Sequence, residues 1–169
     1  MSITPFHFGP AALVHAISPK RVSFLSFCAA SVLVDLEPLY YLLSGEQFLH
    51  RFFHTYIGVT AVILCTVWLF ILALRLKHWR RLPNLFGWKH LTLQPIVLGA
   101  ILGGYSHIFL DSLMHADIMP FAPFSLDNGL YRLLSVDTLE WICLYSGILG
   151  ALMITVRKMI RRSKSPLQQ

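Results

Sequence analysis

The segment GGYSHIFLDSLMH, residues 103–115, decides the architecture of this chain. It begins with the small and apolar residues of a membrane helix and then places His107, Asp111 and His115 at successive i, i+4 positions. On a helix this spacing predicts that all three side chains project from one side. Ionisable residues inside a membrane span are costly and usually face a bundle interior, so the segment predicts a functional site with partners on other helices. The alternative is a set of hydrogen-bonded residues that only fixes helix packing.

The composition indicates an integral membrane protein. The 169 residues are 56% hydrophobic and only 13% charged, whereas about a quarter of a soluble domain is charged. The net charge is +6, and twelve of the 14 Lys and Arg residues lie within 20–21, 75–89 and 157–164. This clustering follows the positive-inside rule, so it predicts that these segments and the C-terminus are cytoplasmic. It also makes nucleic-acid binding a poor explanation of the charge.

The apolar segments predict an all-α, polytopic membrane bundle that forms a single domain over residues 1–169. A span needs about 20 residues, and four segments meet this length, at about residues 22–43, 57–76, 94–114 and 135–156. A shorter apolar segment precedes them at residues 4–17 and predicts a re-entrant or spanning helix.

Two further features of the chain complete this arrangement. Residues 77–93 are the predicted basic inner loop and residues 157–169 the predicted basic cytoplasmic tail. Pro38 is expected to kink or end the second segment, because proline lacks a backbone donor and crowds the preceding turn.

Counting residues from the basic turn after the first segment places several polar side chains at one depth. His7 lies about 12 residues from this turn and Asp35 about 14, which corresponds to roughly 18 and 21 Å along a helix. His50 and His54 directly precede the third segment on its outer side. Together with the ionisable residues of segment 103–115, they predict one site in the outer half of the bilayer.

Two imidazoles stand at i, i+4 in the sequence HRFFHT, residues 50–55. On a helix, His50 and His54 would both reach one cation, as in the helical two-histidine zinc motif but without its glutamate. The alternative is an interfacial segment that carries them for packing. Arg51 lies on the outer side against the charge rule, so we expect an anion beside it: a substrate phosphate, Glu46 or another carboxylate.

Either one of Asp35 and Glu37 is a ligand and the other a supporting group or base, or the break at Pro38 turns both inward. The alternative is a buried ion pair with Arg51. In the outer connection and the start of the last segment, Asp117, Asp137 and Glu140 are expected to support the ligands or cap helices. The predicted metal ligands are His7, Asp35, His50, His54, His107, Asp111 and His115, and the predicted catalytic residues are Asp35, Glu37 and Arg51.

The number of candidate ligands bears on the kind of metal site. A catalytic zinc uses three protein ligands and a water, so this surplus favours two ions, or one ion whose ligands are themselves held by further groups. Mixed imidazole and carboxylate ligation suits zinc, or manganese or iron, rather than Cu(I) or calcium.

Four short motifs within residues 4–124 carry a family resemblance: TPFHFG at 4–9, DLE at 35–37, HRFFHT at 50–55 and SHIFLD at 106–111. Together they resemble the bacterial inner-membrane, metal-dependent hydrolase family, which is distantly similar to zinc-dependent phospholipase C. The resemblance implies an inner-membrane location and metal-binding or catalytic roles for His7, Asp35, His50, His54, His107 and Asp111. Glu37 departs from the pattern, since relatives often have aspartate there, and Pro38 follows it.

The sequence therefore predicts a membrane-embedded hydrolase with an outward-facing site. A metal-activated water would attack a lipid or lipid-linked ester or phosphoester, Asp35 or Glu37 would take the proton, and Arg51 would hold an anionic headgroup. Two alternatives use the same residues. A metal or proton transporter would need polar residues through the inner half of the spans, which is apolar apart from small residues such as Thr66 and Gly99. A non-catalytic assembly protein would contain no metal.

Overall fold

The computed structural model describes residues 4–76 and 83–163, and its regular elements are all helices. In chain order they are η1 (Thr4–His7), α1 (Phe8–Ile17), α2 (Phe24–Leu43), η2 (Phe52–His54), α3 (Tyr56–Leu76), η3 (Leu85–His90), α4 (Leu93–Met114) and α5 (Val136–Ser163). Helices α2, α3, α4 and α5 are long and apolar enough to cross a membrane, which confirms the predicted helical membrane bundle. Parts of the predicted inner loop and tail, residues 77–82 and 164–169, lie outside the described residues.

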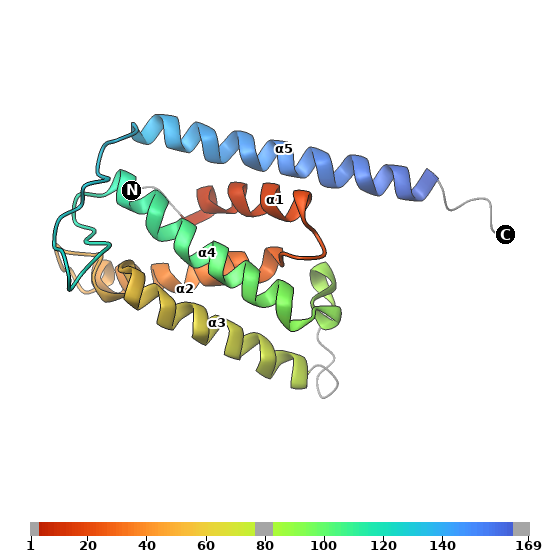
Figure 1. The fold of residues 1–169 in the computed structure, drawn as a ribbon, viewed down its shortest axis with the longest axis horizontal. Helices are drawn as coiled ribbons and strands as arrows, with labels where there is room; N and C mark the ends of the chain where they lie inside the picture. The colour runs from red at the N-terminus through yellow and green to blue at the C-terminus, as the bar shows by residue number, and fades with distance from the viewer. Residues whose placement is uncertain (1–3, 77–82, 164–169) are drawn as a thin grey trace.

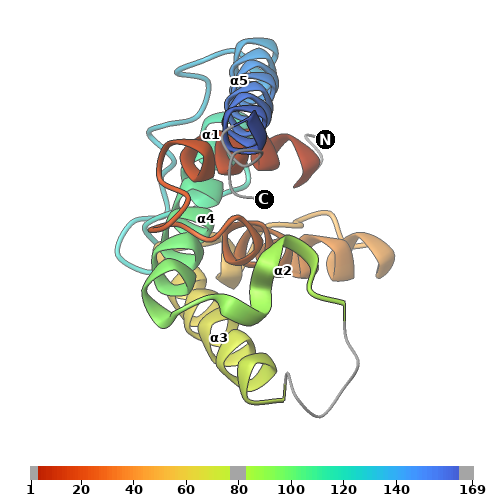
Figure 2. The same ribbon diagram turned by 90° about the vertical axis from the view of Figure 1, so that its right-hand side faces the viewer.

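The helices run along the long axis of the molecule (Figure 1). Helices α1, α3 and α5 start at the end that holds the connections 44–55 and 115–135, and α2 and α4 return to it. Seen end-on, α5 lies over α1, α3 lies on the opposite side, and α2 and α4 lie between them (Figure 2). The basic turn at 20–21, the end of α3, η3 and the end of α5 all lie at the other end, which we call the basic end.

Small residues let the helices approach closely. A Cβ atom on Gly103 of α4 would collide with the backbone carbonyl of Phe27 in α2, and one on Gly9 of α1 would collide with the carbonyl of Cys143 in α5. Close approach through small residues is typical of helix packing in membranes. Because Gly103 lies one turn before His107, this contact also sets the position of the polar part of α4.

An apolar core fills the space between α2, α3 and α4. Its buried residues are Ala30, Val34, Val59, Val62, Ile63, Ala100 and Ile108. These residues occupy the faces on which the three helices meet, and Val34 and Ile108 are direct sequence neighbours of Asp35 and His107. The polar residues of α2 and α4 are therefore anchored on a packed apolar layer.

The ends of α2 and α5 can be compared with expectation. Helix α2 ends at Leu43, as expected for this segment, so the buried Pro38 does not end it near the carboxylates. Proline removes one intrahelical donor while its φ remains compatible with a helix, so a long helix tolerates the loss. Helix α5 continues past residue 156 to Ser163, because Arg and Lys are good helix formers and need not stop the helix where the apolar run ends.

The N-terminal helix is too short to cross a bilayer alone. Helix α1 has ten residues, about 15 Å at 1.5 Å per residue, against about 30 Å of hydrocarbon. The turn η1 precedes it and ends at His7. Helix α1 therefore begins beside the polar residues of α4 and ends at the basic turn. This placement explains how His7 reaches the interior of the bundle.

Candidate metal centre

Four ionisable side chains from α2, η2 and α4 meet in one group: Asp35, His54, His107 and Asp111. One ligand atom of each lies within 4.8 Å of those of the others. Nε2 of His107 is 3.1 Å from Oδ1 of Asp35 and 3.2 Å from Oδ2 of Asp111. Nε2 of His54 is 3.7 Å from the same two oxygens. The convergence predicted from sequence depth is confirmed for these four residues.

The group fits a divalent cation. The Nε2 atoms of His54 and His107 are buried and have no hydrogen-bond partner within the described ranges, although the carboxylates lie at ion-pair distance. Buried polar atoms rarely lack a partner, and two imidazoles with two carboxylates form a donor set typical of zinc, manganese or iron. The carboxylates of the buried Asp111 and the half-buried Asp35 favour a nearby positive charge, which a divalent ion would supply.

A second group of possible ligands adjoins the first. His50, Asp111 and His115 also bring ligand atoms within 4.8 Å of one another, and the ring centroids of His50 and His115 are 4.7 Å apart. Asp111 belongs to both groups. Its carboxylate would therefore be available to an ion in either group, and two ions would supply the chemistry of two-metal hydrolytic sites.

Carboxylates hold two of the histidines by their other ring nitrogen. Nδ1 of His50 is 2.9 Å from Oδ2 of Asp117, and Nδ1 of His54 is 3.4 Å from Oε2 of Glu37. A protonated Nδ1 that donates to a carboxylate leaves Nε2 as the metal-binding atom, an arrangement common among metal-bound histidines. Asp117 thus lies where a group that supports His50 would lie, and Glu37 has the corresponding place beside His54; the supporting role itself stays a prediction.

The connection around residues 50–55 is not α-helical, so His50 and His54 do not share a helix face as expected. Only Phe52–His54 forms a 3-10 turn. Oε2 of Glu37 accepts hydrogen bonds from the backbone N–H groups of Arg51 at 3.2 Å and Phe53 at 2.9 Å. These bonds tie the connection to α2 and send the two imidazoles into different groups.

The expected single helix face of His107, Asp111 and His115 is found only for the first two. His115 has φ −113° and ψ 129°, so it lies beyond the end of α4 in extended backbone. Asn128, which the sequence analysis did not identify, donates its Nδ2 to the carbonyls of Ser112 at 2.9 Å and His115 at 3.0 Å. An isolated asparagine in a loop carries no sequence signal for this role.

His7 reaches the site from the N-terminal segment. Its Nε2 is 3.1 Å from Oδ1 of Asp111, the oxygen opposite the one that faces His107, and its ring centroid is 4.4 Å from that of His107. The side chain is buried. This contact positions Asp111, while direct metal ligation by His7 stays a prediction.

Arg51 lies at the edge of the site. Its Nη2 is 2.9 Å from Oε2 of Glu46, and its guanidinium carbon lies 3.8 Å from the centre of the Tyr41 ring. Glu46 was one of the anions expected beside Arg51, and this expectation is confirmed. A role of Arg51 in holding substrate stays a prediction.

A pocket of about 540 Å³ opens beside the second group. Its polar wall contains His50, Arg51 and Asp117, and its apolar wall includes Phe48, Phe52, Ile57 and Met119. All four apolar side chains are also exposed to the surroundings of the molecule. The pocket thus combines an apolar outer rim with a charged inner wall.

The pKa values of the two histidines of the connection are displaced in opposite directions. Burial, together with the charge of neighbouring His54, lowers the pKa of His50 and favours its neutral form, although Asp117 opposes the change. Burial also disfavours the charged form of His54, but the contacts with Asp35 and Glu37 outweigh burial and raise the pKa of His54. In the metal-free protein, His54 therefore holds a proton more readily than His50.

Comparisons of the chain with protein-family models, with curated proteins and with solved structures give no match. The resemblance to the inner-membrane hydrolase family therefore stays a prediction.

Proposed function

We propose that this protein is a membrane-embedded, metal-dependent hydrolase that acts on lipid or lipid-linked esters or phosphoesters, in agreement with the family resemblance. The observation that carries the proposal is the buried group of Asp35, His54, His107 and Asp111, in which two imidazole nitrogens converge with two carboxylates. A divalent ion held there would act as a Lewis acid and lower the pKa of a bound water.

The chain's own residues divide the remaining tasks. The side chain of Asp35 is 23% exposed, against 6% for Asp111, so Asp35 is the more accessible carboxylate to accept a proton. Glu37 is engaged by His54 and two backbone amides, so we assign it the positioning of His54. This assignment resolves the choice between Asp35 and Glu37 in favour of Asp35 as the base.

The adjoining pocket supports a lipid-like substrate. An acyl chain or other apolar group would contact the apolar wall of the pocket, and Arg51 would hold an anionic headgroup. The apolar wall includes Phe48, Phe52, Ile57 and Met119. A phosphoester or ester placed between these walls lies next to His50 of the second group. Membrane lipids reach such a site laterally, without leaving the bilayer.

The apolar layer beside the group favours a hydrolase over a transporter. Val34, Val59, Ile63, Ala100 and Ile108 are buried between α2, α3 and α4. A path for metal ions or protons to the basic end would need polar groups that replace hydration. We also propose, from the family resemblance, that the protein lies in a bacterial inner membrane. The positive-inside rule then places its C-terminus in the cytoplasm and its metal centre toward the periplasm.

The proposal is tested by turnover in reconstituted protein. Purified protein in vesicles should release product from phospholipid or lipid-phosphate substrates, a chelator should abolish the release, and added zinc or manganese should restore it. H107A should be inactive. H90A removes a histidine from the basic end and should retain activity. Metal-loaded, folded protein that turns over none of a panel of ester and phosphoester lipids would contradict the proposed reaction.

A further inference from the structure

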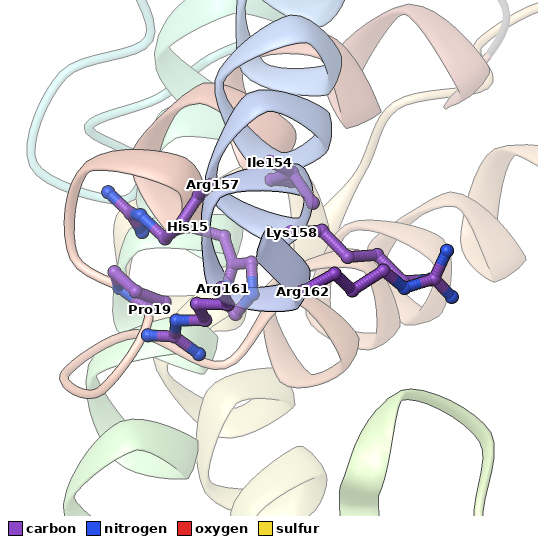
Figure 3. Close-up of a pocket in the computed structure, with 7 residues that line it drawn as sticks. All are labelled: His15, Pro19, Ile154, Arg157, Lys158, Arg161 and Arg162. Atoms are coloured by element: carbon purple, nitrogen blue, oxygen red, sulfur yellow. The ribbon is translucent and has the colours of Figure 1, made fainter. Parts of the chain in front are cut away.

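A second pocket lies at the basic end, remote from the metal centre. It has a volume of about 420 Å³ and is an open pocket between the end of α5 and the turn after α1 (Figure 3). Four cations of α5 line it, Arg157, Lys158, Arg161 and Arg162. The opposing wall contains Pro19 and His15, whose Nδ1 donates to the carbonyl of Val22 at 2.8 Å.

The cations form two i, i+4 pairs on α5. Figure 3 shows Arg157 and Arg161 on the side of Pro19, and Lys158 and Arg162 on the other side of the helix. Helix C-termini favour cations, and cytoplasmic helix ends are often basic. Neither tendency accounts for a pocket whose other wall comes from α1 and the turn after it. The pairing of this wall with the cations suits an anionic ligand.

No Asp or Glu side chain lies at this pocket. All eight Asp and Glu residues lie within residues 35–46 and 111–140, and these segments belong to the opposite end of the bundle. Within the described ranges, none of the four cations of α5 forms an ion pair; the recorded pairs lie around the metal centre. The four cations are therefore available to an anion from outside the chain.

An apolar pocket directly adjoins the cationic one. It has a volume of about 340 Å³ and shares His15 and Ile154 with its neighbour. The rest of its lining includes Phe24, Leu25, Phe86, Leu91 and Ala151, so it lies between α1, the start of α2, η3 and α5. A ligand that fills both pockets must join an anionic group to an apolar chain.

We propose that this pair of pockets binds an anionic phospholipid of the cytoplasmic leaflet, with its phosphate among the cations of α5 and an acyl chain in the apolar pocket. Basic pockets between helices at the cytoplasmic side of a membrane are suited to such headgroups. The lipid would join α5 to α1 and to η3. The proposal is independent of the metal centre and of the proposed hydrolase activity.

The test compares two lipids with the same acyl chains. Phosphatidylglycerol and phosphatidylcholine are titrated separately into the detergent-purified full chain, and bound lipid is counted by native mass spectrometry. Phosphatidylglycerol should bind saturably and more tightly. R161Q should weaken its binding about fivefold and R157Q/R161Q about 25-fold, because each Lys or Arg near an anionic surface contributes about fivefold. R75Q removes the same charge from the end of α3, away from the pocket, and should change binding less than twofold.

A second variant separates a lipid from a free anion. A151W fills the apolar pocket without changing the charge, so it should weaken phosphatidylglycerol binding, and inorganic phosphate at millimolar concentration should not displace the lipid. All variants must elute from gel filtration as the wild type does. Equal losses in R161Q and R75Q, equal binding of the two lipids, or displacement by inorganic phosphate together with normal binding by A151W would each overturn the proposal.

Discussion

The Asp117 carboxylate lies 2.9 Å from Nδ1 of His50, although 67 positions separate the two residues in the chain. This contact fixes the ring so that Nε2 remains for a metal ion. D117A should therefore lower metal affinity by about 10- to 100-fold, as loss of such supporting carboxylates does elsewhere. D127A removes an exposed aspartate of the same connection and is the matched control. Competition with a chromophoric chelator measures both affinities; equal affinities in the two variants would show that Asp117 does not support a ligand.

The variant E37Q tests whether Glu37 positions His54 while Asp35 acts as the base. Because its carboxylate holds His54 and the backbone of Arg51 and Phe53, E37Q should lose metal affinity, again by about 10- to 100-fold, and recover activity when metal is in excess. Metal titration and turnover are measured on the same preparation. An E37Q protein that binds metal as tightly as the wild type but has no turnover would identify Glu37 as the base and refute our assignment.

The contact between α2 and α4 predicts a coupling between packing and metal binding. G103A places a methyl group against the Phe27 carbonyl, so it should destabilise the protein by about 1–3 kcal/mol through overpacking and displace His107. G129A is the control, because a Cβ at Gly129 would meet no other atom within 4 Å. Thermal unfolding and metal content are the measurements. A G103A protein as stable as G129A would contradict the described helix packing.

Acid should compete with metal at this site. Imidazole ligands must be neutral to bind a metal, and His54 has a raised pKa in the metal-free protein, so protonation begins to oppose binding at a higher pH than for an ordinary histidine. Metal affinity should fall as the pH is lowered from about 8 to 5. Calorimetry in buffers of different ionisation enthalpy should show protons released on binding, with fewer released as the pH rises. Binding without proton release at pH 7 would count against histidine ligation.

Hydrophobic length alone predicted most of the helices. The segments expected at about 22–43 and 94–114 correspond to Phe24–Leu43 and Leu93–Met114, because the thickness of the hydrocarbon sets both the start and the end of an apolar run. The end of α5 was placed too early, since a helix continues into its basic residues without any apolar signal. Of the two effects expected of Pro38, an end of the helix is not found, because one missing donor does not end a long helix.

The convergence of the ionisable residues of the site was predicted from the sequence, but their arrangement within the two groups was not. Rise per residue was enough to bring His7, Asp35 and His107 to one level. The assignment of His50 and His54 to different groups depends on the path of a connection that is held by Glu37. Contacts between a loop residue and a distant partner leave no periodic pattern in the sequence, so the structure was needed to reveal them.

The central claim is that buried histidines and aspartates of this bundle hold a metal ion, and elemental analysis of purified protein tests it most directly. Wild-type protein and H90A, purified in detergent without chelator and then supplied with zinc or manganese, should each contain one or two ions per chain after desalting. The double variant H107A/D111A, folded as judged by gel filtration, should contain almost none. Wild-type protein without metal above background after this treatment, or H107A/D111A with the same content as H90A, would contradict the account.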